Sequence, residues 1–222
     1  MKTNFLKPFM LLFFIFNLIT FGGFAQKGIS FTADLNPQVS WMLNSDDSDL
    51  DAFSQKAYVR PAFGLGATYN FTDNLGLGAD VRFSMQGRKA EVDNVETSAA
   101  LDYLKVPLYF SYNTNPAKNI QFVGKIGPQV SFLSNARLLD AEGEEIDHNI
   151  MSSYENVTVG GFLSLGAEYR LTPMLNVFTL ARCDMDFTNA EDNEVAGYID
   201  GRSSTHNATI GIQAGVRLKF SK

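Results

Sequence analysis

The sequence predicts an all-β protein, specifically an eight-stranded antiparallel up-and-down transmembrane β-barrel. Polar and apolar residues alternate with a period of two in eight segments. The connections between these segments are alternately long and short, and aromatic residues gather near the segment ends. Each segment can cross a bilayer as a tilted strand, which needs roughly 9 to 11 residues. The segments span residues 30–42, 58–71, 74–85, 102–112, 120–132, 157–171, 174–187 and 207–220.

Residues 1–25 are interpreted as a signal peptide that precedes the fold. Lys2 and Lys7 come before an apolar run, and Gly23 and Ala25 are small residues at the positions that a signal peptidase reads. An uncleaved membrane anchor is the alternative, although the run is short for a spanning helix. Cleavage after Ala25 leaves residues 26–222 as a single outer-membrane barrel domain.

One face of every segment is apolar and carries no charge. This face takes the odd-numbered residues of 30–42, 58–71 and 74–85, and the even-numbered residues of 104–112 and 120–132. It continues with the odd-numbered residues of 157–171 and 174–187, and with the even-numbered residues of 207–220. Alternation of this kind is typical of strands with one apolar and one polar face.

The opposite face combines glycines with thirteen charged residues, and this combination predicts that the polar face lies inside. An eight-stranded barrel has an interior barely wide enough for side chains, so glycines beside long arginines and lysines suit it. Aromatic residues at both ends of the apolar face are typical of a barrel in lipid. A soluble barrel with an apolar core is the alternative. The predicted lumen charges are Asp34, Arg60, Asp80, Arg82, Lys105, Lys125, Glu168, Arg170, Arg182, Asp184, Asp186, Arg217 and Lys219.

These charges favour an ion-paired plug over a selective channel, because buried charge is tolerated only when it is paired and hydrogen-bonded. We expect four acids to pair with five arginines, although the sequence does not fix which pairs form. The acids are Asp80, Glu168, Asp184 and Asp186, and the arginines are Arg60, Arg82, Arg170, Arg182 and Arg217.

The long connections, at 43–57, 86–101, 133–156 and 188–206, hold most of the 24 acidic residues. Short connections at 72–73, 113–119 and 172–173 contain Asp, Asn and Pro, which favour tight turns. Short turns belong on the periplasmic side, so both termini are expected in the periplasm. Asp46, Asp47, Asp49 and Asp51 are weak candidates for a calcium site, but solvated loops are favoured and no cofactor is expected. Expected partners are outer-membrane lipid, lipopolysaccharide and envelope proteins that the acidic loops contact.

Four sequence segments carry a resemblance to a known family: residues 101–108 (LDYLKVPL), 124–130 (GKIGPQV), 166–171 (GAEYRL) and 215–220 (GVRLKF). They resemble the outer-membrane β-barrel or porin-like family, PorT-type, of Gram-negative bacteria. The resemblance covers nearly the whole chain after residue 25. It implies an eight-stranded barrel in the outer membrane but no particular activity, because members of the family share no single one.

The net charge and the few candidate catalytic residues argue against two classes of function. A formal net charge of -6 argues against a nucleic-acid partner, which needs a basic face. Ser203, Ser204 and His206 could serve a lipid-modifying enzyme, but no positioned acid or oxyanion donor accompanies them. The sequence therefore favours a non-enzymatic protein with a structural or surface-interaction role. A narrow diffusion channel is the alternative, and a lipid-modifying enzyme is the less favoured one.

Overall fold

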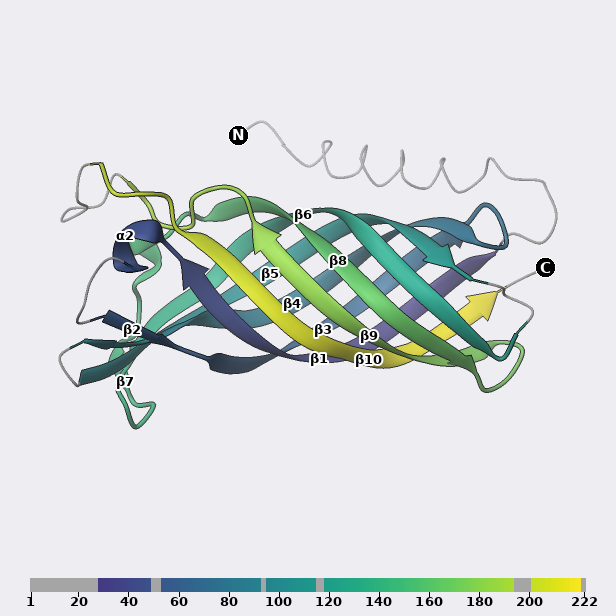
Figure 1. Cartoon of the computed structure of the whole chain (residues 1–222), viewed down its shortest axis with the longest axis horizontal. Coiled ribbons are helices and arrows are strands. Elements are labelled where there is room, and N and C mark those ends of the chain that lie inside the picture. The colour runs from purple at the N-terminus through teal and green to yellow at the C-terminus, as the bar shows by residue number, and fades with distance from the viewer. Residues whose placement is uncertain (1–27, 49–52, 93–94, 115–117, 194–200, 221–222) are drawn as a thin grey trace, which may run out of the picture.

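The structure, a computed structural model, is a closed antiparallel barrel of eight long strands (Figure 1). It describes residues 28–48, 53–92, 95–114, 118–193 and 201–220. Each strand pairs with its neighbours in chain order, and pairing between the first and last strands closes the barrel. The predicted fold class is confirmed. The strands are β1 Ile29–Leu43, β3 Tyr58–Asn70, β4 Leu75–Val92, β5 Val95–Asn113, β6 Ile120–Leu139, β8 Val157–Arg170, β9 Leu175–Asp186 and β10 His206–Phe220.

The apolar side chains lie on the outer surface of the barrel. Phe31, Leu35 and Ile210 are 50% to 55% exposed, whereas Gln213 and Arg217 on the opposite face are fully buried. Since the apolar set points outward, the alternative of a soluble barrel with an apolar core is wrong.

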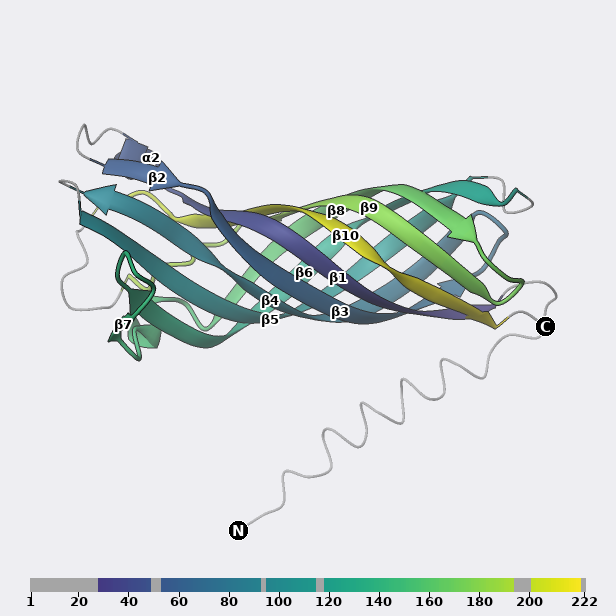
Figure 2. The ribbon, with the colours of Figure 1, turned by 90° about the horizontal axis from the view of Figure 1, so that it is seen from below.

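Both ends of the barrel chain lie at the end with the short turns. Ile29 pairs with Phe220 there, and Figures 1 and 2 show β1 beginning and β10 ending side by side. Two of the short turns share one hydrogen-bonding pattern. The Thr72 hydroxyl accepts from the Leu75 amide at 2.7 Å, and the Thr172 hydroxyl accepts from the Leu175 amide at 3.0 Å. A threonine three residues before the next strand therefore stabilises each turn.

Four small elements lie at the opposite end: α2 Ser45–Ser48, β2 Phe53–Lys56, β7 Glu145–Asp147 and a 3₁₀ turn at Met151–Ser153. The strands also extend further here than the alternation predicts. β4 and β5 pair as far as Val92 and Val95, so the predicted long loop at 86–101 is wrong: it is a β-hairpin. β6 likewise continues to Leu139. Tyr154 and Ala190, from two other connections, pack in one cluster with Ala99 and Leu101 of this hairpin. Both faces of β5 are buried there, so the sequence does not alternate with the period of two from which strands are predicted.

Among the described residues, no helix is long and apolar enough to cross a membrane. The predicted signal peptide, residues 1–25, lies outside them.

Candidate functional site

The predicted lumen charges mostly point into the barrel and are buried. Asp80, Arg82, Lys105, Lys125, Glu168, Arg182, Asp184, Asp186 and Arg217 are at most 4% exposed. The side chain of Asp34 is 1% exposed. Arg60, Arg170 and Lys219 lie nearer the barrel ends and are partly exposed. A narrow barrel lined by long side chains can bury this much charge only if the charged groups find partners.

The central cluster joins β1, β3, β4, β5 and β6. Arg82 donates two hydrogen bonds to Asp34, with Nη1 to Oδ2 at 3.0 Å and Nη2 to Oδ1 at 2.8 Å. The Tyr109 hydroxyl donates to Asp80 at 2.8 Å and lies 3.0 Å from the Thr68 hydroxyl. The Lys125 ammonium lies 4.6 Å from the centre of the Tyr109 ring, a cation–π contact. Charges and an aromatic ring therefore fill the middle of the lumen.

Two further clusters sit on either side of it. Arg182 and Asp184, both on β9, form a two-pronged pair with contacts of 2.7 and 2.9 Å, and the Arg182 guanidinium stacks 3.9 Å over the ring of Phe162. Toward the short-turn end, the Glu168 carboxylate lies 3.1 Å from Arg217 Nε and 2.8 Å from Lys219 Nζ. The carboxylates of Asp184 and Glu168 are thus each paired with at least one cation.

The expected pairing scheme differs from the observed one at several residues. Asp186 accepts hydrogen bonds from Thr158 at 2.9 Å and from Asn207 at 3.0 Å, with no ion pair to an arginine among the described residues. Arg60 pairs at 3.3 Å with Asp102, which sequence reasoning missed. Asp102 is an even-numbered residue of β5, and the even-numbered residues of this strand are predicted to face outward. The register between β5 and β6 shifts beside it, however. An irregularity of this kind is invisible to a period-two pattern.

Glycines make the space that these side chains occupy. A Cβ atom on Gly64 would lie 2.5 Å from Arg82 Nη1, and one on Gly78 would lie 2.5 Å from the Tyr109 ring. The polar inward positions are not all paired: both side-chain polar atoms of Gln213 are buried without a hydrogen-bond partner among the described residues. The interior is therefore crowded at its centre but not fully hydrogen-bonded by protein.

An apolar cluster lies at the outer mouth, above the charged lumen. Its buried members are Met42, Ala99, Leu101, Tyr103, Leu133, Ala136, Tyr154 and Ala190, and Ile150 and Met151 pack against it. The segment between β6 and β8 supplies several of these residues, so a connection expected to be solvated instead folds across the mouth. The apolar residues of that connection indicated that it could be buried, but their spacing did not predict where they would pack.

Ion pairs and hydrogen bonds tie the outer connections together. Asp47 on α2 lies 3.0 Å from Arg88 and 2.8 Å from Arg202, which joins the first, second and last outer connections. Asp46 accepts hydrogen bonds from the backbone amide of Ser203 at 2.7 Å and from its hydroxyl at 2.8 Å. These hydrogen bonds lower the pKa of Asp46 below its ordinary value.

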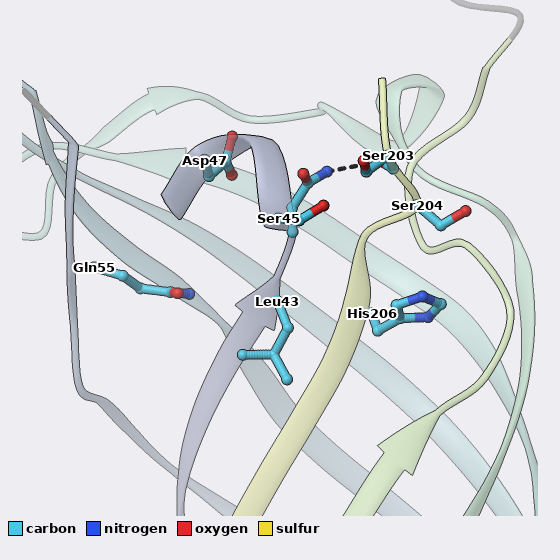
Figure 3. Close-up of a pocket in the computed structure, with 8 residues that line it drawn as sticks. Leu43, Ser45, Asp47, Gln55, Ser203, Ser204 and His206 are labelled. Atoms are coloured by element: carbon cyan, nitrogen blue, oxygen red, sulfur yellow. Dashed lines mark hydrogen bonds between the residues drawn. The ribbon is translucent and has the colours of Figure 1, made fainter. Parts of the chain in front are cut away.

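These contacts border a cavity of about 620 Å³ at the outer rim (Figure 3). The segments that follow β1 and precede β10 supply its walls: the Asn44 amide donates to the Ser203 carbonyl at 2.8 Å and to the Thr205 hydroxyl at 2.8 Å. The lining is polar except at one residue. It consists of Leu43, Asn44, Ser45, Asp47, Gln55, Ser203, Ser204 and His206.

The weak calcium candidates and the serine–histidine candidates both fall in this region. The carboxylates of Asp46 and Asp47 are engaged by Ser203 and by two arginines, whereas Asp49 and Asp51 lie outside the described residues. Within the described ranges, no group of three or more His, Cys, Asp or Glu side chains could hold a metal ion. The Ser203 hydroxyl donates to Asp46. Among the residues that the structure describes, no hydrogen bond joins Ser203 or Ser204 to His206, so neither serine is paired with a histidine base there.

Comparison with protein families finds a match over residues 15–190 to the family described as outer membrane protein beta-barrel domain. No curated protein matches the chain. Among solved structures, Neisserial surface protein A is similar with a TM-score of 0.52 at 13% identity, over 86% of this chain and 97% of that one. A major outer membrane protein from Thermus thermophilus is similar with a TM-score of 0.51 at 12% identity, over 87% of this chain and 99% of that one. At these identities the two structures support the fold alone.

Proposed function

The chain belongs to the outer membrane protein β-barrel domain family, and from that premise we propose that it is a non-enzymatic structural or surface-interaction protein. It resides in the outer membrane. In this proposal the lumen is closed to solutes, and the outer connections form the surface that meets partners. We also propose that residues 1–25 are cleaved, that both termini are periplasmic and that the chain is of the PorT type.

The observation that carries the closed lumen is the buried pairing of Arg82 with Asp34 at the centre of the barrel. Their side chains are 2% and 1% exposed. Tyr109 on β5 and Lys125 on β6 are also buried in the lumen and contact each other. A solute would have to displace paired charges, and separating a buried pair is strongly unfavourable. The apolar cluster at the outer mouth supports the same interpretation.

The observation that supports a surface role is the way in which ion pairs hold the outer connections. Asp47 links two arginines from different connections, and Arg202 also lies 3.1 Å from Glu191. Because these contacts order the surface before any partner binds, less conformational entropy is lost on binding. Lipopolysaccharide and envelope proteins are the proposed partners.

The test is to fold the chain without residues 1–25 in detergent and compare its electrophoretic mobility with and without boiling. The same sample is then placed in planar bilayers. A heat-dependent mobility without conductance steps is the expected result. Discrete steps would overturn the closed lumen and favour the narrow channel, in which the lumen arginines and lysines would select anions. Lipid turnover that a Ser203→Ala variant abolishes would overturn the non-enzymatic role.

A further inference from the structure

The cavity at the outer rim opens on the membrane side of the wall, not into the lumen. Leu43 and His206 are cross-strand partners at the ends of β1 and β10. Leu43 shares the numbering of the outward residues Phe31 and Leu35, and His206 shares that of Ile210. Figure 3 shows Leu43 and His206 on adjacent strands below Ser45, Ser203 and Ser204. A ligand here would therefore lie beside the barrel, above its apolar band.

Trp41 indicates where the cavity lies relative to the membrane–water interface. This residue lies two positions before Leu43 on the same face of β1 and is the only tryptophan in the chain. Tryptophan concentrates at the membrane–water interface of such barrels. At about 3.3 Å per residue along a strand, Leu43 lies roughly 7 Å or less beyond that level. The cavity is then at the depth of the lipid headgroups in the outer leaflet.

The lining has the chemistry of a site for hydroxyl groups. The Gln55 amide nitrogen donates to the Met42 carbonyl at 3.0 Å, which leaves its oxygen as an acceptor. The Ser204 side chain is exposed, and His206 Nδ1 is buried with no partner among the described residues. Leu43 and the imidazole of His206 add apolar surface for the C–H face of a sugar ring. At about 620 Å³ the cavity has the size of typical small-molecule sites.

The charges around the cavity argue against phosphate as the main group recognised. Asp47, the one charged residue of the described lining, is paired with Arg88 and Arg202. Arg202 is shared between Asp47 and Glu191. The cavity thus presents neutral hydrogen-bond donors and acceptors. Arg88 and Arg202 beside it already pair with carboxylates, which weakens their attraction for a phosphate.

We infer that this cavity binds the saccharide headgroup of a glycolipid in the outer leaflet, with Gln55, Ser204 and His206 as hydrogen-bonding residues. The inference rests on the proposed surface role and gives that role a defined site. The occupant is a lipid-linked sugar, because the cavity faces sideways at headgroup depth and its polar groups are uncharged or paired.

The test uses the folded chain in phosphatidylcholine vesicles, with and without rough lipopolysaccharide, and Trp41 fluorescence as the reporter. Lipopolysaccharide is expected to change the Trp41 emission in a saturable way. The double variant Ser204→Leu/His206→Ala should bind about tenfold more weakly, because it removes two of the hydrogen-bonding side chains of the lining. Ser152→Leu is the matched control, since Ser152 is an exposed serine in the connection between β6 and β8. It should bind as the unchanged chain does.

Two further probes separate the possible ligands. Dephosphorylated lipopolysaccharide should still bind, and loss of its binding would show that phosphate is recognised and overturn the inference. Soluble core oligosaccharide should bind much more weakly than the lipid-linked form, and equal affinity would overturn the lipid as occupant. Equal binding by the double variant and the unchanged chain would overturn the site. None of these outcomes depends on conductance, so failure here and failure of the closed lumen are distinguishable.

Discussion

The lumen and the outer rim are both held by charge pairs, but water reaches the two regions differently. In the lumen, Arg82 and Asp34 have side chains that are 2% and 1% exposed. At the rim, Arg202 and Asp47 are 18% and 10% exposed, and Lys56 and Glu96 are 43% and 20% exposed. A buried charge that loses its partner stays buried, whereas a rim charge can turn to water. The fold therefore depends more on the lumen pairs than on the rim pairs.

The sharpest way to break this comparison is to remove one half of a lumen pair. Arg82→Met leaves Asp34 buried without its cation, so we expect a loss of about 3–5 kcal/mol in the free energy of unfolding. Urea unfolding in lipid vesicles, followed by heat-dependent mobility, measures it. The double variant Arg82→Met/Asp34→Leu should recover most of the loss, because neither charge then remains. A single variant as stable as the unchanged chain would contradict the difference drawn between the regions.

The next largest effect concerns the apolar cluster between the two regions. Leu101→Ala removes a fully buried side chain, and we expect a loss of about 2–3 kcal/mol, the low end for such changes because neighbouring loop residues can move inward. The same urea titration checks it. Leu104→Ala on the same strand is the control: Leu104 is 40% exposed on the outer surface, so its loss should be smaller. Equal losses would mean that the cluster does not close the mouth.

The eight strands were predictable because a membrane-spanning barrel imposes one apolar and one polar face on every strand. Where the barrel leaves the lipid, that constraint ends. Residues 98–103 of β5 are all buried, on both faces, so the alternation disappears and the hairpin was mistaken for a loop. The membrane-spanning part of each strand can thus be predicted from its own local sequence. The extensions of the strands beyond the lipid cannot, because they depend on which other segments pack against them.

The lumen residues were predictable one by one, but their partners were not. Arg82 and Asp34 are 48 residues apart, and only the register of three strands brings them together. The rim cavity was even harder to predict from the sequence, since two residues of its lining, Asn44 and Ser203, are separated by 159 residues. Ser203, Ser204 and His206 were noticed as candidates for catalysis, yet the structure places them beside Asn44 and Gln55 in a cavity lining. Residue type alone does not reveal such neighbours.

A smaller effect sharpens the comparison by testing how tightly the lumen is filled. A Cβ atom on Gly78 would lie 2.5 Å from the Tyr109 ring, whereas one on the outward Gly124 would lie 3.2 Å from Leu165 Cδ2 at the lipid surface. We expect Gly78→Ala to cost about 1–2 kcal/mol through overpacking, and Gly124→Ala to cost less, because a lipid-facing leucine can move. Unfolding of both variants in vesicles compares them. If Gly78→Ala were the milder change, the lumen centre would have room to spare.

The smallest effect is local and belongs to the rim. Hydrogen bonds from the Ser203 amide and hydroxyl lower the pKa of Asp46 below its ordinary 3.8. A carboxyl whose pKa is lower in the folded state stabilises that state above the unfolded pKa, and the contribution is lost as the pH falls through the folded pKa. The contact between the first and last outer connections should therefore hold at neutral pH and weaken below about pH 4. Amide exchange at Ser203, corrected for its intrinsic rate, should show protection that declines in this range, whereas Asp46→Asn should show weak protection at every pH. Because the barrel pairs do not involve Asp46, amide protection in β1 and β10 should be unchanged in that variant, and a parallel loss there would tie the rim to the fold after all.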